Sequence, residues 1–133
     1  MWRDMEREAA RLGLPFRRPS AFPRSALLPM RVATLGAAEP WMGEYCRRVM
    51  LQNWAEDREI DNDAAVRNAL GGLVPDPGQV IAAAQDPGNK LRLRANTEEA
   101  QARGIFGAPS FFVGDELFWG KDRLDAAIAP AAG

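Results

Sequence analysis

Hydrophobic residues recur every three or four positions over most of the chain, the spacing that gathers them on one face of a helix. At the start, Trp2, Met5, Ala9 and Leu12 follow this spacing, and Gly13 is a typical residue just past a helix end. The pattern predicts a helix from the first residue to Leu12. No capping residue precedes this helix, so we expect further sequence upstream of it.

A longer predicted helix runs from Pro40 to about Glu56, and its apolar residues fill two adjacent rows. One row holds Trp41, Tyr45 and Val49, and the other holds Met42, Cys46, Met50 and Trp54. A face this wide packs against two neighbours, so a core role is favoured; the alternative is that the Met and Trp residues line a substrate pocket. By the same reasoning, Cys46 is expected to be a buried, unreactive thiol.

Polar residues stand where four further helices are expected to begin. They are Ser25, Asn62 (or Asp61 as the alternative), Asp76 and Asp86, ahead of helices predicted up to residue 35 and over residues 63–70, 77–84 and 87–103. Both Asp76 and Asp86 precede a proline at the first helical position, so they are interpreted as structural caps rather than catalytic acids. The acidic run over residues 56–61 is interpreted as a solvated loop.

The pattern changes near the C-terminus, where two short runs rich in aromatic residues flank a Gly-Asp pair. The runs cover residues 110–113 and 116–119, with Gly114 and Asp115 between them. This pattern predicts a tight β-hairpin, followed by a short helix that begins near Asp122. Two strands alone are marginal in water, so the hairpin needs further strands on its open edge.

The pair Ala108-Pro109 stands directly before the first strand. Proline has no N–H and is tolerated at the start of a strand, and an X-Pro bond is the usual place for a cis peptide. If this bond is cis, the N–H and C=O of Ala108 are available to pair with a bound peptide as a short extra strand. The alternative is a trans proline that only opens the strand.

A proline-rich stretch over residues 14–24 contains Phe16 and Phe22 between its prolines. Prolines bias a chain toward extended conformations, so the stretch is predicted to be a bridge between two lobes, with its aromatic rings packed down.

The composition and charge of the chain exclude several classes of function. The formal net charge of −1 gives no attraction to nucleic acid or to an anionic membrane. No apolar run is long enough to span a membrane and no signal peptide is present, so a cytoplasmic location is expected. One cysteine and no histidine exclude an internal disulfide, a Cys-x-x-Cys centre and a Ser-His-Asp triad. No metal site is predicted.

Charge is nevertheless uneven, because residues 1–32 hold seven arginines against three acids. Solvated arginines are the favoured reading, and a rim that attracts an anionic substrate is the alternative.

Several short stretches together resemble a known family. They are MWRDME at residues 1–6, GLPF at 13–16, ANTEEA at 95–100, GIFGAP at 104–109 and FWGKDRL at 118–124. In this order they resemble the 2-hydroxychromene-2-carboxylate isomerases, relatives of kappa-class glutathione transferases in the DsbA-like branch of the thioredoxin fold. The resemblance covers nearly the whole chain, and its C-terminal motif is specific.

The resemblance implies an α/β, thioredoxin-like fold of the DsbA/kappa type with an inserted all-helical lobe. Residues 1–24 would form a helix and bridge of the thioredoxin-like core, residues 25–86 the helical lobe, and residues 87–133 the C-terminal helix, hairpin and helix of the core. Family members begin with a strand, a helix and a second strand, and this unit is expected to be missing here.

The resemblance also implies a reaction, the interconversion of 2-hydroxychromene-2-carboxylate and trans-o-hydroxybenzylidenepyruvate. Glutathione would be the cofactor, a small aromatic compound the substrate, and a homodimer the assembly. Family members hold the glutathione thiol with a serine near the end of their first strand. None of Ser20, Ser25 and Ser110 matches that position, so no catalytic residue is assigned.

Four residues acquire cofactor-binding roles from the resemblance: Ala108, Pro109, Lys121 and Asp122. Ala108, held by Pro109, would present its main chain to the cysteinyl part of glutathione. Lys121 and Asp122 would hold the γ-glutamyl end beside a helix N-terminus. A plain N-cap role for Asp122 and a solvated side chain for Lys121 are the alternatives. A kappa-like transferase and a non-catalytic thioredoxin-like remnant remain open as other functions.

Overall fold

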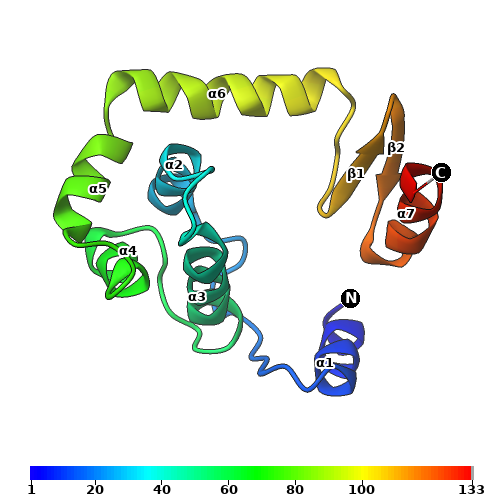
Figure 1. Cartoon of the computed structure of the whole chain (residues 1–133). Coiled ribbons are helices and arrows are strands. Elements are labelled where there is room, and N and C mark those ends of the chain that lie inside the picture. Colours follow the sequence, from blue (N-terminus) through cyan, green and yellow to red (C-terminus); the bar gives the residue numbers. More distant parts are fainter. Residues whose placement is uncertain (133) are drawn as a thin grey trace. The chain divides into compact units, whose positions relative to one another are not determined.

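The computed structural model describes residues 1–132, as helices α1 to α7, a 3-10 helix η1 and strands β1 and β2 (Figure 1). Contacts divide the chain into two compact units, Met1–Leu93 and a second that begins at Arg94. The described chain is mostly helical with one C-terminal hairpin, as predicted. The domain boundaries at residues 24 and 86 stay predictions.

The first unit contains five complete helices and the start of a sixth. They are α1 (Trp2–Arg11), α2 (Leu27–Leu35), α3 (Met42–Trp54), α4 (Asp63–Leu70), α5 (Pro77–Ala84) and α6 (Pro87–Ala102). Each end lies within two residues of the predicted one, because caps, prolines and glycines mark these ends in the sequence.

Helices α2 to α5 enclose the core of this unit. Its buried members are Val32, Tyr45, Val66, Ala69, Leu70, Ile81 and Ala84. Tyr45 is the largest of them, and its hydroxyl donates to the carbonyl oxygen of Pro29 at 2.9 Å. The polar end of this ring is therefore satisfied inside the core, and burial raises the pKa of Tyr45 above its usual value.

Three of the four predicted caps are confirmed. Asn62 accepts from the N–H of Ala65 at 2.7 Å, Asp76 from that of Gln79 at 3.2 Å, and Asp86 from that of Gly88 at 3.0 Å. The cap predicted at Ser25 is wrong.

Helix α2 begins instead at Leu27, and a carboxylate far away in the sequence accepts a hydrogen bond from its first turn. Asp61 accepts from the N–H of Leu28 at 2.7 Å, and the Ser25 hydroxyl donates to the same carboxylate. Desolvation raises the pKa of Asp61, but the hydrogen bonds from the Ser25 hydroxyl and from main-chain N–H groups outweigh it, so the pKa is lowered. The acidic run over residues 56–61 is thus not simply solvated, which corrects the sequence-based interpretation.

The Asp57 carboxylate is also paired, which again corrects the interpretation of the acidic run as a solvated loop. Its carboxylate pairs with the guanidinium of Arg24 at 2.6 Å and accepts from the N–H of Ser20 at 2.8 Å. The hydrogen bond from Arg24 is the main reason that the pKa of Asp57 falls to about 2. The carboxylate therefore fastens the proline-rich bridge to the end of α3.

The prediction that the aromatic rings of the bridge pack down is confirmed in part. Phe16 stacks on Trp54 with ring centroids 6.3 Å apart, and Phe22 meets Trp2 edge-on at 5.0 Å. Phe22 is still 52% exposed, so only one side of its ring is covered.

The second unit carries the hairpin. It contains the end of α6, β1 (Ser110–Val113), β2 (Glu116–Trp119), η1 (Lys121–Arg123) and α7 (Leu124–Ala132). The two strands are antiparallel, with Ser110 opposite Trp119 and Val113 opposite Glu116. Gly114 takes a φ of 61°, the left-handed conformation that a two-residue turn requires. Helix α7 packs on both strands and buries Ala127.

Candidate functional site

The Ala108–Pro109 junction lies at the foot of the hairpin, and its peptide bond is cis, the first of the two alternatives that the sequence left open. Both residues are exposed. The Ser110 hydroxyl donates to the carbonyl of Gly107, which ties the loop to the start of β1. Within residues 1–132 the main chain of Ala108 makes no hydrogen bond of its own. An extended peptide can therefore pair with it.

One hydrogen bond brings the two halves of the predicted site together. The N–H of Gly120 donates to the carbonyl of Pro109 at 2.9 Å, one position beyond the last strand pair. Gly120 has a φ of 101°, and the chain then turns into η1, which begins at Lys121. Ala108 and Pro109 thus lie beside the chain segment that carries Lys121 and Asp122.

Asp122 is not the N-cap that the sequence suggested as one alternative. The capping position of η1 is Gly120, and no side chain caps this helix. The Asp122 carboxylate folds over Gly120 instead, where an added Cβ would lie 2.5 Å from Oδ1. It lies 4.0 Å from Nε of Arg123 and is 83% exposed. Lys121 is exposed as well. A ligand can reach both side chains from solvent.

Two aromatic residues beside this junction were missed by the sequence-based reading. Phe106 and Trp119 are 73% and 51% exposed, and their ring centroids lie 5.1 Å apart. The indole covers Gly107 so closely that an added Cβ would lie 2.3 Å from its Nε1. The available signal was that Phe106 and Trp119 belong to the GIFGAP and FWGKDRL motifs, respectively.

The three serines serve structural roles. Ser20 donates its hydroxyl to Asp57, Ser25 to Asp61 and Ser110 to the carbonyl of Gly107.

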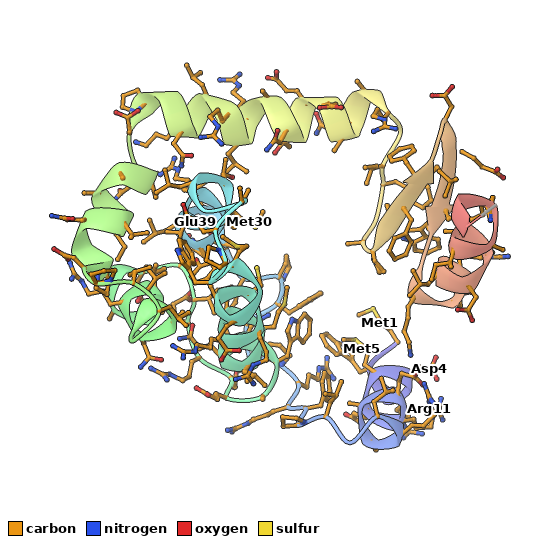
Figure 2. The ribbon with its side chains drawn as sticks, in the orientation of Figure 1. Met1, Asp4, Met5, Arg11, Met30 and Glu39 are labelled. Atoms are coloured by element: carbon orange, nitrogen blue, oxygen red, sulfur yellow. The ribbon has the colours of Figure 1, made fainter. Side chains whose placement is uncertain are left out.

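A second concave feature lies in the first unit, between the bridge, α2 and α3. We call it the α2–α3 hollow; it has a volume of about 280 Å³. Its wall consists of Phe22, Pro23, Arg24, Ala26, Pro29, Met30, Ala33, Tyr45, Cys46, Val49, Met50, Asn53, Trp54 and Ile60. Met30, labelled in Figure 2, contributes the α2 side of the opening.

The hollow revises the predicted role of α3. Tyr45 is buried, but Met50 is 58% exposed and Cys46 is an exposed free thiol, so the prediction of a buried cysteine is wrong. Met42, the first residue of the second apolar row, does pack against the core. Cys46, Met50 and Trp54 of the second row border the hollow, together with Tyr45 and Val49 of the first row.

Of the seven arginines in the basic N-terminal stretch, Arg24 is buried in its pair with Asp57, and two others form ion pairs on α1. On α1, Arg7 bonds to Asp4 and Arg11 to Glu8, and Figure 2 labels Asp4 and Arg11 on that helix. These pairs are exposed, which fits the favoured reading of solvated arginines.

Two further findings apply to all of residues 1–132. No helix within residues 1–132 is both long and apolar enough to cross a membrane. The same residues contain no group of three or more Cys, Asp or Glu side chains placed to hold a metal ion.

Comparisons with known proteins identify the family and the fold of the chain. The model of the DSBA-like thioredoxin domain matches residues 1–128. A 2-hydroxychromene-2-carboxylate isomerase from Sphingobium xenophagum is 33% identical over 134 residues, covering 94% of this chain and 63% of that protein. A solved structure of a 2-hydroxychromene-2-carboxylate isomerase superposes with a TM-score of 0.82 at 24% identity, covering 97% of this chain and 63% of the other. The chain thus spans about 63% of both relatives' length, and it belongs to the DsbA-like thioredoxin domain family.

Proposed function

We propose that this chain provides the glutathione-binding part of a glutathione-dependent isomerase of the 2-hydroxychromene-2-carboxylate isomerase type. The observation that carries the proposal is the Gly120–Pro109 hydrogen bond of 2.9 Å. It holds Pro109, the neighbour of the unpaired Ala108 main chain, against the segment that carries the exposed carboxylate of Asp122. The name of the 33% identical relative supports the reaction type.

The residues present suit a γ-glutamyl tripeptide. The N–H and C=O of Ala108 offer the two hydrogen bonds of an antiparallel strand pair to the cysteinyl residue. The Asp122 carboxylate matches the ammonium group of the γ-glutamyl residue, and Lys121 brings a positive charge near its carboxylate. When bound, glutathione would supply a thiolate that adds reversibly to a double bond.

Exposed aromatic side chains border the same junction. Phe106 and Trp119 give it an apolar wall, which suits a small aromatic substrate next to a peptide-like cofactor. A homodimer is part of the proposal, and size measurement by light scattering tests it.

Calorimetric titration with glutathione tests the binding claim. The unaltered chain is expected to bind. The variant Asp122→Asn should bind roughly ten- to a hundredfold more weakly, because a hydrogen bond to a charged group contributes about 1.5–3 kcal/mol.

Asp125→Asn is the matched control, since Asp125 is also exposed and lies three residues further along, in the first turn of α7. Its affinity for glutathione should match that of the unaltered chain. Equal losses in the two variants, or no binding by the unaltered chain, would argue against the assigned site.

Activity measurements separate the remaining functions. Isomerisation of 2-hydroxychromene-2-carboxylate only when glutathione is present supports the proposal. Conjugation of glutathione to another electrophile without isomerisation favours a kappa-like transferase. Glutathione binding without either activity favours a non-catalytic thioredoxin-like module.

A further inference from the structure

We propose that the α2–α3 hollow is a binding site for an uncharged aromatic ring that carries a short apolar substituent. The site lies within residues 22–60 of the first unit and uses none of the residues assigned to glutathione. It goes beyond the proposed function and does not rest on it.

The size of the hollow sets the size of the ligand. A closed apolar cavity of about 150 Å³ is enough to hold benzene. The volume here is about 280 Å³, so one ring and a chain of a few carbons fit, whereas a helix does not. The side chains of Met30 and Met50 are 49% and 58% exposed, so this part of the wall faces solvent.

The composition of the wall favours a ring over a plain alkyl chain. Phe22 and Trp54 present tilted rings whose centroids lie 5.9 Å apart. The sulfur-containing residues Met30, Cys46 and Met50 belong to the same wall. Sulfur and aromatic edges make favourable contacts with a further ring, and flexible Met side chains adapt to its outline.

The polar groups of the wall explain why the ligand is uncharged. The guanidinium of Arg24 is only 6% exposed and pairs with Asp57 at 2.6 Å. It also donates to Oδ1 of Asn53 at 2.9 Å. A ligand carboxylate would have to replace Asp57 at this guanidinium, which would leave a second carboxylate without its partner.

Tyr45 completes this set of internally paired groups, because its hydroxyl is already committed to Pro29. An uncharged aromatic ligand disturbs none of these hydrogen bonds.

Cys46 makes a convenient reporter, because it is the chain's single cysteine and lies on the wall. The experiment measures the rate at which N-ethylmaleimide modifies Cys46 at increasing concentrations of n-butylbenzene or 4-butylbenzoate. These probes differ only by a carboxylate. We expect saturable protection by n-butylbenzene, with an apparent affinity roughly tenfold or more above that of 4-butylbenzoate.

Two substitutions of the same kind locate the site. Ala33→Phe places a ring into the hollow and should abolish protection, whereas Ala64→Phe, on the exposed face of α4, should leave it unchanged. Circular dichroism establishes that both variants are folded. If Ala33→Phe does not fold, the two probes on the unaltered chain still decide the question.

A third variant tests the charge argument. Asp57→Asn removes the negative partner of Arg24, so 4-butylbenzoate should then protect Cys46 at least as well as n-butylbenzene does. No saturable protection of the unaltered chain, or equal protection by the two probes, would overturn the proposal. So would protection that follows protein concentration rather than probe concentration, because a second copy would then occupy the hollow.

Discussion

Single residues determine the shape of the candidate site, and glycines show this most clearly. Gly107 lacks the Cβ that would collide with Trp119, and Gly120 lacks one that would collide with Asp122. Gly120 also adopts a positive φ, which other residues rarely take. The glycines of the GIFGAP and FWGKDRL motifs thus allow two side chains of the second motif, Trp119 and Asp122, to fold over the main chain.

Replacing Gly107 with Ala should move the indole of Trp119 with little loss of stability. The colliding atom belongs to a half-exposed side chain, which can turn away. We expect a change in tryptophan emission and a change in melting temperature of no more than a few degrees.

Gly43→Ala is the matched control, because its added Cβ meets nothing within 4 Å and Gly43 lies inside α3. It should leave the emission unchanged and stabilise the helix by about 1 kcal/mol or less. A large loss of stability in Gly107→Ala with unchanged emission would contradict the predicted motion of the indole.

The ion pair between Asp57 and Arg24 should make stability depend on acidity. The pKa of Asp57 in the folded chain is about 2, below its ordinary value of 3.8, because Arg24 bonds to the charged form. The folded state therefore binds this proton less readily than the unfolded state. The stabilising contribution is complete above about pH 4 and is lost as pH falls toward 2.

Asp57→Asn should accordingly unfold at a lower temperature than the unaltered chain at pH 6, with the difference shrinking between pH 4 and pH 2. Thermal unfolding followed by circular dichroism measures this. Asp63→Asn is the control, since Asp63 forms an exposed pair with Arg67 on one helix. A constant difference across the whole pH range would exclude the linkage.

At the level of elements, local sequence signals predicted the helices well. Asn62, Asp76 and Asp86 hold their helix ends through bonds to residues two or three positions ahead, so sequence spacing alone reveals them. The start of α2 was not predictable in this way, because Asp61, more than thirty positions away, serves its first turn. The hairpin was predicted because its turn needs a glycine at Gly114.

The start of α4 and the start of α2 are capped differently, so removing a side chain at each should change the free energy of unfolding by different amounts. Asn62→Ala should destabilise the chain by about 1 kcal/mol, since α4 loses its own side-chain cap. Ser25→Ala should cost less, because the main-chain bond from Leu28 to Asp61 remains. Chemical denaturation of the two variants under the same conditions compares them, and a larger loss for Ser25→Ala would show that the hydroxyl matters more than the distant carboxylate.

For the whole molecule, the family follows from motifs that lie far apart in the sequence, whereas the candidate site could be predicted only in part. Ala108, Pro109, Lys121 and Asp122 were identifiable because they belong to two short motifs. The exposure of Cys46 and Met50 was not, because apolar spacing does not reveal which residues of a helix face its neighbours cover. Cys46 and Met50 therefore looked like core residues, although they border the α2–α3 hollow.

The central claim is that glutathione pairs with the main chain of Ala108 and reaches Asp122. The most direct test is a titration of the 15N-labelled chain with glutathione, monitored by amide chemical shifts. The account predicts saturable shifts for the amides of Ala108, Gly120 and Asp122, and none for Gln79 on α5. Unchanged amide shifts at Ala108 and Asp122, at glutathione concentrations that saturate binding in calorimetry, would contradict it.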